Sequence, residues 1–223
     1  MKKLSALILA ILMGISLVAC ESINSDRIRS DEDSIVDGQQ FSAPGQEEKT
    51  GSKAEGDNTS GTEGNNILVA YFSHSGNTRE IANQIHGRIG GDLFEIVTVN
   101  PYPSEYGAVV DQARKEQADD YRPELATKVE NMDSYDVVFV GYPNWFETMP
   151  MAVFSFLEEY DLSGKTIVPF CTHEGSRLGR SVEDIKRLCP QSTILDGLAI
   201  RGRDVKNAQN EVYEWLHELG MIE

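Results

Sequence analysis

The fold of this chain is decided by one stretch, Ile67-Leu68-Val69-Ala70-Tyr71-Phe72-Ser73-His74-Ser75-Gly76-Asn77-Thr78. Its first half is an apolar run typical of a buried strand, and small polar residues then lead into a helical pattern. Such a turn leaves free backbone N–H groups where a helix begins, and the helix dipole there favours an anion. The stretch therefore predicts a phosphate-binding loop, with an ordinary strand–helix turn as the alternative interpretation.

The predicted loop contains no lysine, so it differs from the Gly-rich Lys-Ser/Thr loop of nucleotide triphosphatases. The hydroxyl groups of Ser73, Ser75 and Thr78 can donate hydrogen bonds to phosphate oxygens. A neutral loop rich in hydroxyl groups suits a phosphate monoester.

Four further segments after the first run read as strands, and helical periodicity lies between them: Leu93–Val99, Val137–Gly141, Thr166–Cys171 and Ile194–Ile200. The helices are expected after the loop (Ile81, Ile85, Ile89), in parts of 104–131, over Met151–Tyr160 and along a stripe from Val205 to Leu219. Strands that alternate with helices predict an α/β fold, a three-layer α/β/α sandwich around a five-stranded parallel sheet.

The first residues read as a targeting segment rather than part of the fold. Lys2 and Lys3 precede an uncharged run, Leu4–Ala19, which is too short for a membrane span. The sequence Leu17-Val18-Ala19-Cys20 resembles the lipobox of bacterial lipoproteins, in which the cysteine is lipidated. We therefore expect a signal peptide over 1–19 and lipidation of Cys20; the alternative is an ordinary signal peptide with a chance cysteine.

Residues 20–64 are rich in Ser, Gly, Asp, Glu, Gln and Asn, and Phe41 is their only aromatic residue. Such a segment cannot bury enough apolar surface to offset its chain entropy, so we expect a disordered acidic tether. Residues 65–223 are long enough for one domain with a core.

The domain at 65–223 is acidic, with 25 acidic and 14 basic side chains and a formal charge of −11. This charge argues against nucleic acid as a partner and against direct binding to anionic lipids, so the lipid anchor is the expected membrane contact. The two cysteines of the domain, Cys171 and Cys189, are expected to be separate buried thiols, with a disulfide as the alternative. Two cysteines form no metal-ligand pattern, and we predict no metal site.

Three unusual loops follow three of the predicted strands. The first is the phosphate loop, the second is 141–150 with two adjacent aromatic residues between prolines, and the third is the glycine-rich segment 171–180. Ligands of open parallel sheets bind at the carboxyl ends of the strands, where the strand order reverses. A phosphate loop beside a rigid aromatic side chain is what flavin mononucleotide (FMN) requires, so FMN is the predicted cofactor.

These three loops together resemble the flavodoxin-like superfamily, across the domain from about residue 66 to the end. The resemblance implies the strand order 2-1-3-4-5 and assigns each loop a role. The phosphate would be held by Ser73, Ser75, Gly76, Asn77 and Thr78. The flavin ring would be covered by Pro143, Asn144, Trp145 and Phe146. The pyrimidine edge of the ring would be bordered by Thr172, His173, Glu174, Gly175 and Ser176. His74, Thr148 and Gly179 of the same three loops are also expected to bind the cofactor.

Some of these assignments have alternatives. Trp145 and Phe146 could pack in the core instead, and His173 could lie at the surface or behind the residues that touch the flavin. The third loop also lacks the tyrosine that stacks on the second face of the ring in many electron-carrier flavodoxins, which leaves that face open to a substrate.

The sequence thus predicts an FMN-binding redox protein, anchored outside the cytoplasm, that transfers electrons to or from a partner protein or a small acceptor. One alternative is an FMN-dependent NAD(P)H reductase of quinones or other small acceptors, although nicotinamides are scarce outside cells. Another is a non-redox flavin-binding lipoprotein. No catalytic residue is predicted because the flavin carries the chemistry, and the oligomeric state stays open.

Overall fold

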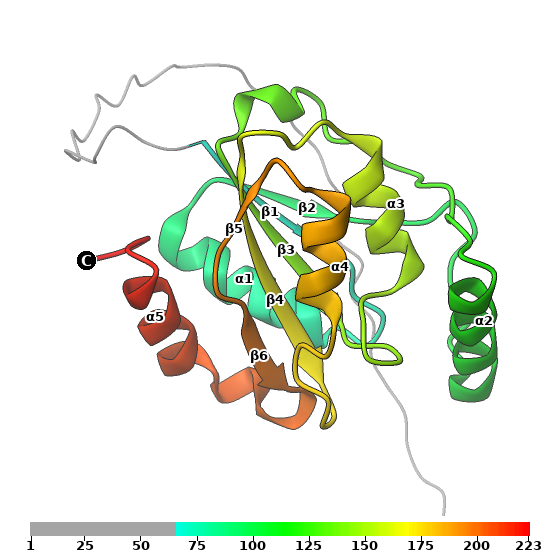
Figure 1. Cartoon of the computed structure of the whole chain (residues 1–223). Helices are drawn as coiled ribbons and strands as arrows, with labels where there is room; N and C mark the ends of the chain where they lie inside the picture. Colours follow the sequence, from blue (N-terminus) through cyan, green and yellow to red (C-terminus); the bar gives the residue numbers. More distant parts are fainter. Residues whose placement is uncertain (1–65) are drawn as a thin grey trace, which may run out of the picture. The chain divides into compact units, whose positions relative to one another are not determined.

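The computed structural model describes residues 66–223 (Figure 1). The predicted signal peptide, Cys20 and the tether at 20–64 lie outside the described residues. The strands are β1 (Ile67–Tyr71), β2 (Asp92–Glu95), β3 (Val137–Pro143), β4 (Thr166–His173), β5 (Thr193–Ile194) and β6 (Leu198–Arg201). The helices are α1 (Asn77–Ile89), α2 (Tyr106–Ala118), α3 (Met151–Glu159), α4 (Ser181–Leu188) and α5 (Gln209–Glu218), with short 3-10 turns η1 (Met132–Ser134) and η2 (Gly202–Asn207).

All strand pairs of the sheet are parallel, in the order β2-β1-β3-β4-β5, and β6 also pairs with β4. The predicted fold class and strand order are therefore confirmed. The order reverses between β1 and β3, so the carboxyl ends of these two strands mark the switch point.

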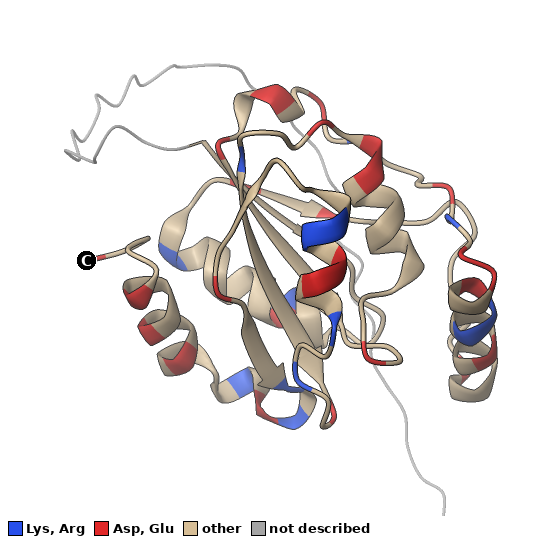
Figure 2. Ribbon diagram, in the orientation of Figure 1, with Lys and Arg blue, Asp and Glu red and all other residues tan. Residues whose placement is uncertain are grey.

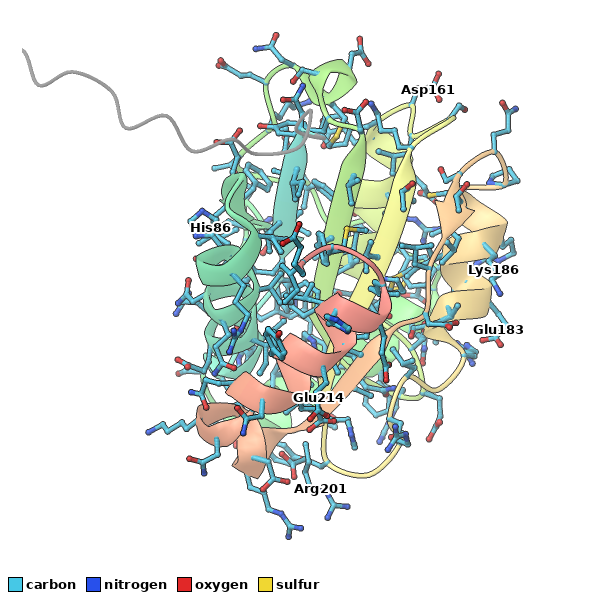
Figure 3. The ribbon with its side chains drawn as sticks, turned by 90° about the vertical axis from the view of Figure 1, so that its left-hand side faces the viewer. His86, Asp161, Glu183, Lys186, Arg201 and Glu214 are labelled. Carbon is cyan, nitrogen blue, oxygen red and sulfur yellow. The ribbon has the colours of Figure 1, made fainter. Side chains whose placement is uncertain are left out.

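Two apolar cores lie on the two faces of the sheet because successive side chains of a strand point to opposite faces. In β1, Leu68 and Ala70 join the core under α3 and α4, whereas Val69 and Tyr71 join the core under α1 and α5. Figure 3 shows α5 in front of the sheet, with the labelled charged side chains of α4, Glu183 and Lys186, projecting away from the core.

Helix α2 lies outside this three-layer arrangement. None of its residues belongs to either core, and Figure 1 shows it to one side of the sheet. The carboxylate of Glu105 caps its first turn by accepting hydrogen bonds from the amides of Gly107 (2.8 Å) and Ala108 (2.6 Å).

Two strand boundaries differ from the predicted ones. β2 ends at Glu95 because its partner β1 turns away into the first loop, and the chain beyond pairs with 124–126 instead, where the amide of Val99 donates to the Glu124 carbonyl (2.9 Å). The fifth strand is divided into β5 and β6. The break lies opposite Pro169 of β4, which has no N–H group to donate to a neighbouring strand. At the break, the three residues 195–197 lie opposite only two residues of β4, 168–169.

Cys171 and Cys189 are free and buried, as predicted. Burial raises the pKa of the Cys171 thiol to about 12 and that of Cys189 to about 11, so both stay protonated at neutral pH. Within residues 66–223, no helix is long and apolar enough to cross a membrane.

Candidate functional site

The first loop turns sharply between β1 and α1. Gly76 adopts a φ of 90°, in the left-handed region that suits glycine, and α1 begins at the next residue. The hydroxyl oxygen of Ser73 accepts a hydrogen bond from the Arg79 amide (3.2 Å). Ser73 thus caps one amide of the first turn of α1, and Gly76 at the N-cap provides no side-chain acceptor, so the other amides of this turn are available to the predicted phosphate.

Thr78 ties the first helix to the end of β4. Its hydroxyl is buried and shares a hydrogen bond with the hydroxyl of Thr172 (2.9 Å). The Thr78 hydroxyl is thus engaged with the third loop in this structure, and the pair fixes the phosphate loop relative to the strand beside it.

The second loop contains a strained two-residue turn. Phe146 and Glu147 have φ values of 51° and 68°, and Trp145 and Thr148 close the turn with two backbone hydrogen bonds of 2.8 and 3.2 Å. Positive φ at both central residues is the pattern of a type I′ turn, which normally carries glycine or asparagine. Non-glycine residues in this region cost on the order of 1–3 kcal/mol each, and such strain concentrates at functional sites.

The third loop holds the second in place. The Asn144 side-chain amide donates to the Arg177 carbonyl (2.7 Å), and the Arg180 amide donates to the Glu147 carbonyl (2.7 Å). Gly179, with a φ of 55°, lies against the same Glu147 carbonyl. The two loops therefore form one connected wall.

A cavity of about 370 Å³ lies where these loops meet. Eleven of the seventeen predicted cofactor residues line it: His74, Ser75, Asn77, Pro143, Asn144, Trp145, Phe146, Thr172, His173, Glu174 and Ser176. The other six, Ser73, Gly76, Thr78, Thr148, Gly175 and Gly179, are not among its lining residues. Of these, Thr148 is buried and donates to the Asp184 carboxylate (2.7 Å), which secures the end of the second loop.

Trp145 both packs against the core and lines the cavity. Its indole makes edge-to-face contacts with the rings of Phe72, His74 and Tyr102, at centroid distances of 5.6, 5.8 and 5.3 Å. These contacts hold the indole in one orientation, so a ligand ring would meet a preorganised surface.

Helix α2 supplies a wall of the cavity that the sequence analysis missed. Tyr106, Val109, Val110 and Ala113 line it, and Gly202 of η2 completes the opposite side. The spacing of Val109 and Ala113 by four residues is the available signal, since it places both on one face of a helix.

Two buried polar atoms at this cavity have no hydrogen-bond partner among the described residues, His173 Nδ1 and Asn144 Oδ1. Burial lowers the pKa of the His173 imidazole below its usual value, so the ring is neutral at neutral pH. The cavity itself is lined by the indole of Trp145 and by the polar residues Ser75 and Asn77, which suits a ligand with a flat ring and a phosphate. The residues present therefore fit FMN.

A doubly wound parallel sheet with an aromatic-lined cavity at its switch point defines a mononucleotide-binding α/β protein. The comparisons identify it further. The sequence model of the family described as flavodoxin matches residues 66–219, and the chain belongs to this family, whose cofactor is FMN.

Solved structures agree with this assignment. A protein from Bacteroides eggerthii, inferred to be a flavoprotein, is 34% identical over 69% of this chain and 97% of its own, with a TM-score of 0.62. A similarly described protein from Bacteroides uniformis is 26% identical over 70% and 99%, with a TM-score of 0.63. A Lactobacillus acidophilus flavoprotein in complex with FMN shares the fold at 20% identity over 64% and 97%, with a TM-score of 0.55. No curated protein matches the chain.

Replacing Trp145 by alanine is expected to weaken FMN binding by about 1–3 kcal/mol, or roughly 5- to 150-fold, because a stacking surface and its burial are lost. Quenching of flavin fluorescence during titration measures the dissociation constant. Tyr213→Ala is the control, since Tyr213 is an exposed aromatic residue on α5 that does not line the cavity. Equal affinities of the Trp145 variant and the unaltered protein would remove the indole from the site.

Proposed function

We propose that the protein is an FMN-binding redox protein that transfers electrons at the outer face of a membrane. The observation that carries this proposal is the cavity shared by the three loops, which is lined by Trp145 and by Asn77 at the start of α1. When bound, FMN supplies the one- and two-electron chemistry.

The residues of the chain bind and orient the cofactor in this proposal. The amides at the start of α1 and the hydroxyl of Ser75 hold the phosphate, and Trp145 contacts the ring. His173 and Asn144 pair with the polar edge of the ring, while Val109 and Ala113 of α2 exclude water from the opposite wall.

The phosphate assignment predicts that FMN binds more tightly than riboflavin, which lacks the phosphate. Two charge-assisted hydrogen bonds of about 1.5 kcal/mol each correspond to roughly 150-fold. Parallel fluorescence titrations with the two flavins measure the ratio. Ser75→Ala should reduce it, whereas Ser104→Ala, which removes a hydroxyl outside the loop, should not. Equal binding of both flavins to the unaltered protein would refute the phosphate site.

The lack of basic side chains in the lining of the described cavity favours electron transfer over nicotinamide-dependent reduction. Among the described residues, no lysine or arginine lines this cavity, so the lining offers no cation to the additional phosphates of a dinucleotide. Steady-state turnover with NADH or NADPH distinguishes the two functions. Rapid electron exchange with chemical donors and no sustained turnover supports the carrier, and a large kcat supports a reductase.

The proposed location rests on the N-terminal sequence, with a lipid on Cys20 as the membrane attachment. Acidic side chains predominate over the described domain, and Figure 2 shows them on several elements. This distribution favours a basic protein partner or an uncharged small acceptor over nucleic acid. Cys20→Ser tests the anchor, since it should shift the protein from the membrane fraction to the soluble fraction without a change in FMN affinity.

A further inference from the structure

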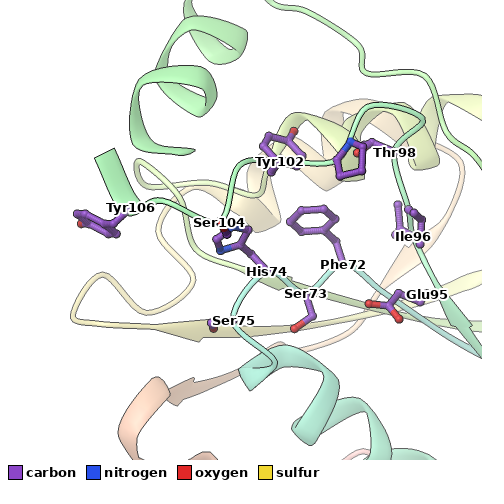
Figure 4. Close-up of a pocket in the computed structure, with 12 residues that line it drawn as sticks. Phe72, Ser73, His74, Ser75, Glu95, Ile96, Thr98, Tyr102, Ser104 and Tyr106 are labelled. Atoms are coloured by element: carbon purple, nitrogen blue, oxygen red, sulfur yellow. The ribbon is translucent and has the colours of Figure 1, made fainter. Parts of the chain in front are cut away.

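A second cavity, of about 590 Å³, lies beside the FMN cavity (Figure 4). It occupies the carboxyl ends of β1 and β2, and its outer wall is the segment from 96 to 106. His74, Ser75 and Tyr106 line both cavities. A ligand of the second cavity would therefore be a direct neighbour of the cofactor.

The walls of the second cavity are mainly apolar and aromatic. Phe72 and Ile96 form its buried side, and Pro101 and Tyr102 lie on the outer segment. The rings of Phe72 and Tyr102 are 5.4 Å apart in an edge-to-face arrangement, and Figure 4 shows both rings beside the cavity. Aromatic side chains arranged in this way suit a flat ring.

The outer wall is fixed in position, so the cavity is preformed. His74 Nε2 bonds to the Pro103 carbonyl (2.8 Å), and the Tyr102 hydroxyl donates to the Glu116 carboxylate of α2 (2.5 Å). Thr98 is buried and donates to the Asn100 carbonyl (2.9 Å). Because this wall is already ordered, ligand binding would cost little conformational entropy of the protein.

The lining contains no lysine or arginine, and its one carboxylate, Glu95, is paired with the guanidinium of Arg79, which is not itself a lining residue. Hydrogen-bond donors are nevertheless present. The Ser73 hydroxyl accepts from a backbone amide and so keeps its proton free to donate, and Ser104 also lines the cavity.

We propose that this second cavity binds an uncharged planar ring bearing carbonyl oxygens, the chemical class of quinones, as the small electron acceptor of the protein. Conversion of the quinone to its hydroquinone takes two electrons and two protons, which the reduced flavin would supply as it is oxidised. The aromatic walls contact the ring, and the hydroxyl groups donate hydrogen bonds to its oxygens. This inference rests on the proposed electron transfer, and it assigns the acceptor a site separate from that of FMN.

The test uses duroquinone, whose fully substituted ring cannot add to thiols, in titrations followed by backbone amide NMR of the protein with and without FMN. In both forms, shifts are expected for residues 72–75 and 95–106. Val97→Trp should fill the cavity and weaken duroquinone binding at least tenfold. Val99→Trp is the matched control, since Val99 is a similarly exposed valine two residues away that does not line the cavity, and it should leave binding within twofold.

FMN affinity, measured on the same samples, should be equal in the Val97→Trp and Val99→Trp variants. This measurement tests the cofactor site separately from the acceptor site. If FMN binds but duroquinone shifts no resonance, or shifts only residues of the FMN cavity, the acceptor site is refuted and the cofactor site stands. Equal binding of duroquinone to the two tryptophan variants refutes it as well. Should Val97→Trp fail to fold, the shift map of the unaltered protein decides.

Discussion

Replacing Gly179 by alanine is expected to lower the free energy of unfolding by about 2–5 kcal/mol and to weaken FMN binding at least tenfold. The added Cβ would lie 2.2 Å from the Glu147 carbonyl oxygen, and crowding of this kind costs about 1–3 kcal/mol. The left-handed φ of 55° adds about 1–2 kcal/mol for a residue with a side chain. Because Gly179 holds the strained Phe146–Glu147 turn against the third loop, its displacement moves the wall that carries Trp145.

Gly175→Ala is the matched control for this prediction. It alters the same loop, but Gly175 has no positive φ and its added Cβ would meet no atom within 4 Å. Urea unfolding followed by circular dichroism, together with FMN titration, should show little change for this variant. If the two alanine variants behaved alike, the close approach of the loops would have no energetic role.

Replacing Gly141 by alanine is the second large change, expected to lower the free energy of unfolding by about 3 kcal/mol through overpacking of the core. Gly141 lies in β3 opposite Phe170 of β4, and the added Cβ would lie 2.1 Å from the fully buried Phe170 ring. Thermal or urea unfolding measures the loss. Combining it with Phe170→Leu should recover part of the loss relative to the sum of the single changes, as expected for residues in contact.

Gly87→Ala provides a control with the opposite sign. Gly87 lies on the exposed side of α1 with no atom within 4 Å of the added Cβ, so alanine should stabilise the helix by about 0.5–1 kcal/mol. If Gly141→Ala lowered the free energy of unfolding by no more than the experimental error of the measurement, the packing of Phe170 against the glycine would be contradicted.

The sheet was predictable because its central strands are buried on both faces. β1, β3 and β4 read as nearly continuous apolar runs, and such runs have few alternatives in an α/β chain. The edges were harder to predict. Val97 and Val99 continue the apolar run of β2, yet they are exposed and pair with a later segment, and pairing partners of this kind are not visible in local sequence.

The loops of the cofactor site were predictable from their position after the strands, since parallel strands bring their carboxyl ends to one edge of the sheet. The contribution of α2 was not, because no local signal shows that a helix leaves the sandwich to line a ligand cavity. The hydrogen bond between Thr78 and Thr172 could not be predicted either, because it joins hydroxyl groups 94 residues apart in sequence.

Because α2 lies outside both cores, its stability depends on whether the cofactor is bound. Val109 and Ala113 of this helix line the cofactor cavity, so a bound flavin would add apolar contacts to α2. Local unfolding of α2 and dissociation of the flavin then become one coupled equilibrium, in which the bound cofactor suppresses fraying of the helix.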